Sequence, residues 1–193
     1  MAHIAIISSS VRTGRNSHRV AVYFQDYLTK NKLSSAEILD LKAYDFTLFD
    51  ERMKYQQNPS DKMLDFQQRI KSSDGVIIVT PEYNGGYPAA LKNVIDLLYD
   101  EWFRKPIGLV AVSDGDFGGT QVITSLQFTL WKMRAWVTPA RFHVQRVDKA
   151  FNESGEPAEP DVMNKRAKSF LAELFWCVEA HNRMKDYQPD HHH

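Results

Sequence analysis

Five short apolar runs alternate with longer amphipathic stretches from one end of this chain to the other. The runs that predict strands are 3–8, 36–39, 75–79, 107–112 and a segment within 136–144. Helical spacing of apolar residues predicts helices over 17–30, 60–72, 88–99, 120–133 and 161–181. Because strands joined by helices run parallel and are covered on both faces, this order predicts an α/β fold with a doubly wound parallel sheet in three layers.

The segments between these runs indicate where the loops lie and how far the domain extends. Residues 40–58 mix aromatic and charged residues without a period, which favours a long loop over the ligand edge of the sheet, and residues 152–160 favour a surface loop. Pro139 predicts that the fifth strand is irregular or lies at the sheet edge. No repeat or linker interrupts the chain, so we expect one domain over 1–188 and a tail over 189–193, whose three histidines resemble the remnant of an expression tag.

Composition limits the kinds of binding partner and the cellular compartment to be expected. Lys and Arg number 24, and so do Asp and Glu, so the chain has no overall basic field for nucleic acid or for an acidic membrane surface. No apolar stretch approaches the ~20 residues that a spanning helix needs, and Met1–Ile4 shows no signal peptide pattern. The single cysteine, Cys177, permits neither a disulfide framework nor a cysteine metal cluster. We therefore expect a cytoplasmic protein without a bound metal.

The loop after the first predicted strand, 9–17, has the composition of a phosphate site. A phosphate needs backbone N–H groups at a helix N-terminus, hydroxyl groups and one or two guanidinium groups. Hydroxyl groups are abundant in this loop, Gly14 permits an unusual turn, and Arg12 and Arg15 supply positive charge. An ordinary capped helix with two solvated arginines is the alternative interpretation of the same residues.

Two familiar phosphate motifs are missing from the sequence. The first loop has no Gly-Lys-Ser/Thr of a Walker A loop and no Gly-x-Gly-x-x-Gly of a dinucleotide-binding fold. These absences argue against an ATPase and a Rossmann dehydrogenase. They leave a mononucleotide as the favoured ligand.

A second loop, 81–86, follows the central-looking strand 75–79 and contains Pro81, Tyr83 and two glycines. Backbone of this kind can approach a planar ring closely, and exposed amides can bond to the ring's carbonyl oxygens and nitrogens. The third loop, 113–119, contains Asp114, Gly115 and Gly118. A simple turn before a helix remains the alternative for both loops.

At these residues the sequence resembles the NADPH-dependent FMN reductase family, flavodoxin-like enzymes that include quinone and azo-dye reductases. The family pattern Gly-Ser-x-Arg-x-x-Arg is matched by 9–15, except that Ser9 stands where the family usually has glycine. The pattern Pro-Glu-Tyr-Asn is matched in full by 81–84, and Pro88, 91–93 and Asp96 follow in family order. The resemblance covers roughly 4–144 and implies a flavodoxin-like, FMN-binding domain with strand order 2-1-3-4-5.

The resemblance also implies which residues bind FMN. The phosphate would be held by a first group of residues from the loop 9–17: Ser10, Arg12, Arg15, Asn16 and Ser17. The isoalloxazine ring would be lined by Pro81, Glu82, Tyr83 and Asn84, and its other edge closed by Ser113 and Gly115. NADPH or NADH would be the electron donor, and a quinone, azo compound, flavin or other electron-poor small molecule the acceptor.

In this interpretation the cofactor carries the chemistry, so no side chain need act as catalytic acid or nucleophile. A non-catalytic electron carrier or flavin redox sensor is one alternative, although a carrier is expected to show the charge imbalance that this chain lacks. A hydrolase or transferase built on Asp40, Glu82 and Asp114 is another. The resemblance further implies a homodimer or a dimer of dimers, with the helix 88–99 as the expected interface beside the aromatic residues of 102–136.

Overall fold

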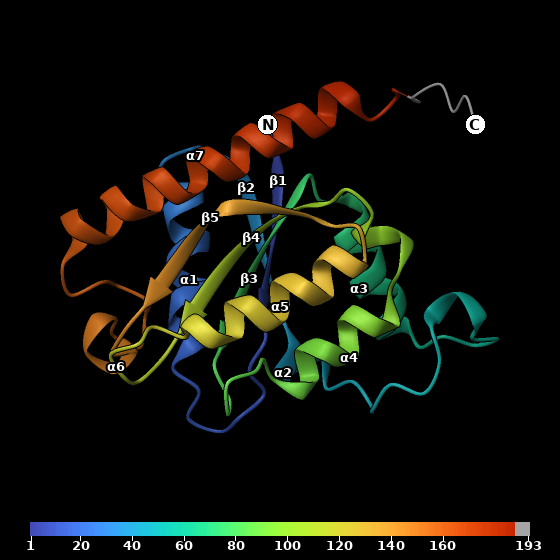
Figure 1. The fold of residues 1–193 in the computed structure, drawn as a ribbon, viewed down its shortest axis with the longest axis horizontal. Coiled ribbons are helices and arrows are strands. Elements are labelled where there is room, and N and C mark those ends of the chain that lie inside the picture. Colours follow the sequence, from blue (N-terminus) through green and yellow to red (C-terminus); the bar gives the residue numbers. More distant parts are fainter. Residues whose placement is uncertain (188–193) are drawn as a thin grey trace.

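A computed structural model describes residues 1–187, and the predicted tail 189–193 with its histidines lies outside the described residues. Its centre is a five-stranded parallel sheet of order β2-β1-β3-β4-β5, which confirms the predicted fold class and strand order (Figure 1). The strands are β1 (His3–Ser8), β2 (Ser35–Asp40), β3 (Gly75–Pro81), β4 (Pro106–Val112) and β5 (Trp136–Val144). The longer helices are α1 (Ser17–Lys30), α3 (Asp61–Ser72), α4 (Ala89–Leu97), α5 (Thr120–Lys132) and α7 (Pro160–Met184).

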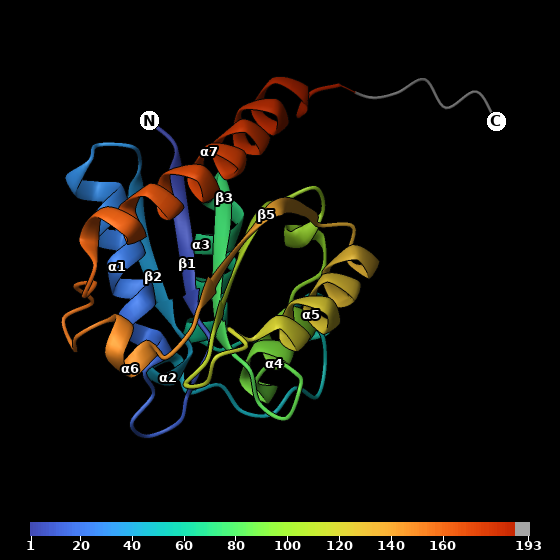
Figure 2. The same cartoon turned by 60° about the vertical axis from the view of Figure 1, so that its left-hand side comes forward.

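Helices cover both faces of the sheet and bury the two sides of each central strand separately (Figure 2). On β1, Ile4 and Ile6 belong to the core formed with α1 and α7, whereas Ala5 and Ile7 belong to the core formed with α3, α4 and α5. This alternation follows from the period of two residues in a strand. A strand that is apolar on both sides therefore lies in the middle layer, as the continuous apolar runs predict.

The edge position of β5 explains its irregular sequence. β5 pairs only with β4, and the register shifts between Ile107 and Leu109, next to the segment that contains Pro139. Proline lacks the N–H that an inner strand would donate, so it is tolerated at an edge. The prediction made from Pro139 is confirmed.

Two short helices depart from the sequence-based prediction. The segment 40–58 is not one uninterrupted loop: it contains α2 (Leu41–Tyr44) and the 3-10 turn η1 (Met53–Tyr55). The Asp40 carboxylate accepts a hydrogen bond from the Lys42 N–H at 3.0 Å and starts α2. The second missed helix, α6 (Val147–Ala150), follows β5 directly. Helices of four residues are too short to show a hydrophobic period.

The aromatic residues near the middle of the chain differ in burial. Trp102, in the 3-10 turn η2 (Asp100–Trp102), is fully buried, and its Nε1 donates to the Ile95 carbonyl at 3.1 Å. Phe103, Trp131 and Trp136 are exposed. The expected interface on the helix 88–99 therefore stays a prediction, with Trp102 assigned to the core. No helix within residues 1–187 is long and apolar enough to cross a bilayer.

We expect Gly155→Ala to destabilise the fold more than Gly85→Ala. Both glycines have a positive φ, +81° and +78°, which costs an alanine about 1–2 kcal/mol. A Cβ at Gly155 would also lie 2.7 Å from the Arg19 carbonyl oxygen, whereas one at Gly85 would meet nothing within 4 Å. Overpacking adds about 1–3 kcal/mol at Gly155 only. Urea unfolding of both variants measures the difference, and equal losses would contradict the predicted close packing of 155 on α1.

Candidate functional site

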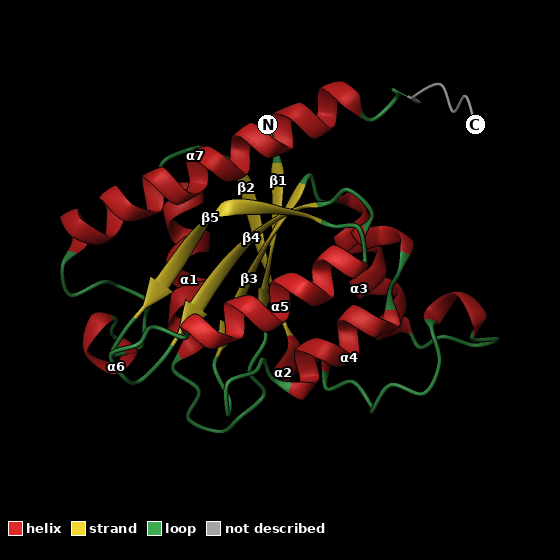
Figure 3. Cartoon of the chain, in the orientation of Figure 1, coloured by secondary structure: helices red, strands yellow, loops and turns green. Residues whose placement is uncertain are grey.

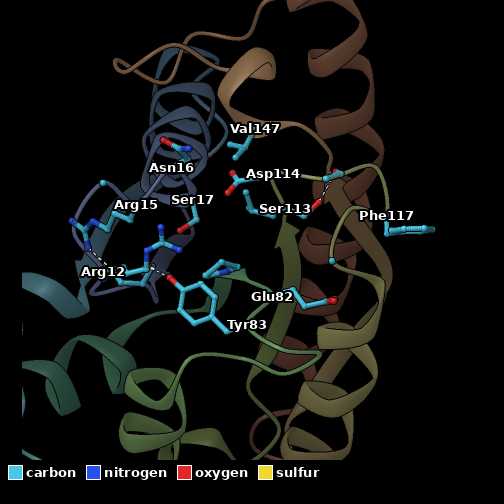
Figure 4. A pocket seen from close by; sticks show the side chains of 16 residues that line it. Arg12, Arg15, Asn16, Ser17, Glu82, Tyr83, Ser113, Asp114, Phe117 and Val147 are labelled. Atoms are coloured by element: carbon cyan, nitrogen blue, oxygen red, sulfur yellow. Dashed lines mark hydrogen bonds between the residues drawn. The ribbon is translucent and has the colours of Figure 1, made fainter.

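Three loops leave the sheet at the carboxyl ends of β1, β3 and β4 (Figure 3). A pocket of about 380 Å³ lies between these loops (Figure 4). It contains ten of the eleven residues predicted for ligand binding, and only Asn84 is not among its lining residues. The ten are Ser10, Arg12, Arg15, Asn16, Ser17, Pro81, Glu82, Tyr83, Ser113 and Gly115. The structure therefore brings together residues that are more than a hundred positions apart in the sequence.

Asn84 lies in a tight turn beside the pocket. Its φ is +51°, and the turn is closed by reciprocal backbone bonds between Tyr83 and Gly86, at 2.8 and 3.0 Å. Asparagine tolerates the left-handed region better than most residues do. In this structure Asn84 shapes the second loop.

A hydroxyl pair connects the first loop to the second. The Ser10 Oγ lies 2.7 Å from the Tyr83 hydroxyl oxygen. The Ser9 N–H donates to the Val79 carbonyl at 3.1 Å, so the first loop leaves the sheet while still bonded to β3. These contacts fix the distance between the two predicted halves of the ligand site.

Arg15 fixes the conformation of the first loop through hydrogen bonds to Asp40 and Ser10. Its guanidinium donates to both carboxylate oxygens of Asp40 at 2.5 Å and to the Ser10 carbonyl oxygen at 2.7 Å. Such a bidentate pair is strong and fixes the side chain's direction. Arg12, by contrast, is exposed and takes part in no ion pair among residues 1–187. Of the two predicted phosphate-binding arginines, Arg12 is the one available to a ligand.

The Arg15–Asp40 pair sets the protonation of its surroundings. Burial opposes ionisation of Asp40, but hydrogen bonds from Arg15 and from the Lys42 N–H outweigh it and hold the pKa of the carboxyl below its usual range. Burial lowers the pKa of His18, and the positive charge of Arg15 lowers it further. His18 is therefore neutral at pH 7, with its Nδ1 3.0 Å from the Ser8 Oγ.

The start of α1 offers unused hydrogen-bonding groups to the pocket. The side chain of Asn16, which precedes the helix, makes no capping bond, and the first N–H groups of a helix have no partner within it. The buried Oγ atoms of Ser9 and Ser17 have no hydrogen-bond partner among the described residues. Buried polar atoms are normally paired, so orphaned hydroxyls beside a helix N-terminus indicate a site that an anion completes.

The second loop is bonded to β4 and α5, and the third loop contains a bond of its own. The Glu82 N–H donates to the Val112 carbonyl at 3.3 Å, and the Glu82 carboxylate accepts from the Val122 N–H at 3.1 Å. The Ser113 Oγ donates to the Gly115 carbonyl at 2.8 Å. Residues of these two loops form the second half of the pocket.

Sequence reasoning did not assign six of the lining residues to the site. They are Gly14, Val112, Asp114, Phe117, Gly119 and Val147. Gly14 and Asp114 stood in the loops already singled out, and the position of Gly119 after Gly118 was a usable signal. Val147 comes from α6, and no sequence pattern pointed to it. Phe117 is 89% exposed at the mouth of the pocket.

Two of the three acidic residues considered for a hydrolase, Asp40 and Glu82, are already bonded to other groups of the protein. Asp40 is bound by Arg15, and Glu82 is bound by the start of α5. No group of three metal-ligating side chains is found among residues 1–187. The carboxylates of Asp40 and Glu82 therefore hold loops in place.

Comparisons with known proteins agree with this geometry. Residues 2–149 match the model of a family described as NADPH-dependent FMN reductase. The NAD(P)H-dependent FMN reductase LOT6 of Saccharomyces cerevisiae is 36% identical over 141 residues, which cover 66% of this chain and 72% of that protein. An NADPH azoreductase of Bacillus sp. is 28% identical over 173 residues, covering 88% of this chain and 92% of that protein.

A solved structure supports the fold. The flavoenzyme NAD(P)H:(acceptor) oxidoreductase FerB from Paracoccus denitrificans superposes with a TM-score of 0.75 at 22% identity. The superposition covers 94% of this chain and 99% of that one. At this identity the likeness concerns the fold alone.

We expect Asp40→Asn to reduce stability at neutral pH and to lose this effect in acid. Asparagine keeps the cap of α2 but removes the charge that Arg15 binds, at a cost of about 1–3 kcal/mol. Because the folded pKa of Asp40 is lowered, its contribution is complete above the ordinary value of 3.8 and disappears as the pH falls through the folded pKa. Unfolding free energies of both proteins at pH 7, 5, 4 and 3 measure this. A difference that stays constant down to pH 3 would contradict the ion pair.

Proposed function

The chain belongs to the NADPH-dependent FMN reductase family, and from this premise we propose that the pocket binds FMN and that the protein uses NAD(P)H to reduce electron-poor small molecules. Quinones and azo compounds are the acceptor classes that we propose. The observation that carries the proposal is the buried Ser17 hydroxyl at the N-terminus of α1, which has no partner among residues 1–187, in a residue that lines the same pocket as the loops after β3 and β4. When bound, FMN supplies the two-electron redox chemistry.

The first loop fits the phosphate of FMN. Ser17 and Asn16 lie at the start of α1, and Arg12 lies at the pocket wall. Within the described residues the Ser17 hydroxyl has no hydrogen-bond partner and Arg12 is in no ion pair. Together these groups supply the helix N-terminus, hydroxyl and guanidinium that a phosphate needs. We assign Arg15 a positioning role, since Asp40 and the Ser10 carbonyl already occupy its guanidinium.

The second and third loops fit the isoalloxazine ring. Pro81, Glu82 and Tyr83 line one side of the pocket, and Ser113 and Gly115 line the other. The Tyr83 hydroxyl is bonded to Ser10, so the ring wall and the phosphate loop are held at a fixed separation. No histidine or cysteine is among the lining residues that the structure describes. Side chains thus orient the cofactor and leave the redox step to it.

We also propose that the protein works as a homodimer or a dimer of dimers in which a second subunit completes the site. The open pocket mouth, with Phe117 exposed beside it, is consistent with a partner covering it. The helix 88–99 is the proposed contact. A cytoplasmic location stays a prediction from the sequence.

A visible absorption titration tests the enzymatic function. Purified protein is mixed with FMN, reduced anaerobically with NADPH, and then given benzoquinone. We expect saturable binding, bleaching by NADPH and recolouring by benzoquinone over repeated cycles. Binding without rapid bleaching would indicate an electron carrier or sensor, and no binding would overturn the flavin assignment.

Ser17→Ala is expected to weaken FMN binding roughly tenfold without reducing the stability of the protein lacking FMN. The Ser17 Oγ has no protein partner to lose, so its removal costs the fold no hydrogen bond, whereas a bound phosphate would lose one. Flavin fluorescence quenching measures the affinity, and urea unfolding without FMN measures stability.

Ser34→Ala is the matched control. Its Oγ is also buried without a partner, but Ser34 is not among the residues that line the pocket. Its FMN affinity should equal that of the unmodified protein. If the two variants bind FMN equally well, the phosphate does not contact Ser17.

A further inference from the structure

A second pocket lies at the opposite end of the sheet from the flavin site. It has a volume of about 500 Å³ and is formed by the turns before β4 and β5 and by the carboxyl end of α7. Figure 1 shows this end of α7 beside the amino ends of the strands, away from the three loops. The seven residues of β4 separate the two pockets by roughly 20 Å. A molecule in the second pocket cannot touch FMN.

Aromatic side chains form one part of this pocket. Phe103, Trp136 and Tyr187 line it and are 38–57% exposed. The Trp136 ring packs edge-to-face against the Trp176 ring, with the ring centroids 6.4 Å apart. The aromatic walls are thus supported and open to a flat ligand.

Positive charge forms the other part. Arg104, Arg134 and Lys185 line the pocket, and no carboxylate is among its lining residues in the described chain. The Arg104 N–H donates to the Arg134 carbonyl at 2.8 Å, so the two arginines start from adjoining backbone. Neither guanidinium takes part in a hydrogen bond or ion pair within residues 1–187, although Arg104 lies over the Phe103 ring at 4.9 Å.

The pKa of a lining histidine reflects the positive charges near the pocket. Burial lowers the pKa of His181, and the charges of Lys105 and Arg104 lower it further. The nearby Asp74 forms no ion pair with Arg104 or Arg134 within residues 1–187. Its carboxylate accepts from the His3 N–H at 2.7 Å and from Asn182 at 3.3 Å.

We propose that this pocket binds a small aromatic acid, with its ring against Trp136 and Tyr187 and its carboxylate or sulfonate on Arg104 and Arg134. Guanidinium groups bind such anions in a bidentate manner, and aromatic walls favour a planar ring. The pocket volume suits a ligand of this size. Binding here is independent of the reductase function, because the site shares no residue with the flavin pocket.

Calorimetric titration of the FMN-saturated full chain tests the proposal. The probes are 2-naphthoate and its neutral counterpart 2-naphthamide, which share the ring and differ in charge. We expect 2-naphthoate to bind with one site per chain and 2-naphthamide to bind at least roughly tenfold more weakly. Equal binding of the two probes, or no saturable binding of 2-naphthoate, would overturn the proposal.

The double variant Arg104→Gln/Arg134→Gln should lose at least roughly tenfold in affinity for 2-naphthoate while keeping its FMN affinity. Its control is Arg183→Gln/Lys30→Gln, which removes the same charge from two exposed helix positions outside the pocket, each paired with an acidic residue. The control should bind 2-naphthoate unchanged. Equal affinities of the two double variants would show that the arginines do not form the site.

Discussion

The parallel alignment of β1, β3, β4 and β5 is the constraint on which the rest of this structure depends. Each inner strand ends bonded to its neighbour, and the ladder continues one residue beyond the strand. Ser9 donates to Val79, Glu82 to Val112 and Ser113 to Val144, at 2.9–3.3 Å. Three loops therefore leave the same edge of the sheet from fixed starting points, as is typical of ligand sites in open parallel sheets.

Contacts between side chains then turn three adjacent loops into one pocket. Ser10 and Tyr83 join the first loop to the second, and Glu82 joins the second to the start of α5. Arg15 and Asp40 hold the first loop against β2. Within residues 1–187 the buried Oγ atoms of Ser9 and Ser17 remain without a partner beside these bonds. A ligand that completed this hydrogen bonding would find the loops already held in place, which would reduce the entropic cost of binding.

The two pockets divide the sheet into ends with different chemistry. The carboxyl ends of the strands present hydroxyl groups and flat backbone, whereas the amino ends of β4 and β5 present aromatic rings and arginines. The chain has 24 basic and 24 acidic residues, and this equal count does not reveal the cluster of positive charge at the amino ends of β4 and β5. Net charge bears on long-range attraction, and it carries no information about how charges cluster on the folded surface.

The sequence by itself determined the layers, the strand-like and helical segments and the three loops, because hydrophobic period and turn residues are local properties of the chain. The family resemblance of its motifs also predicted that Ser10, Tyr83 and Ser113 share one site. Only the tertiary structure decided that Arg15 binds Asp40 while Arg12 stays free, that α6 contributes Val147, and that Arg104 adjoins Arg134. Each of these depends on which distant residue lies within hydrogen-bond or packing distance, and that neighbour is set by the fold and not by local sequence.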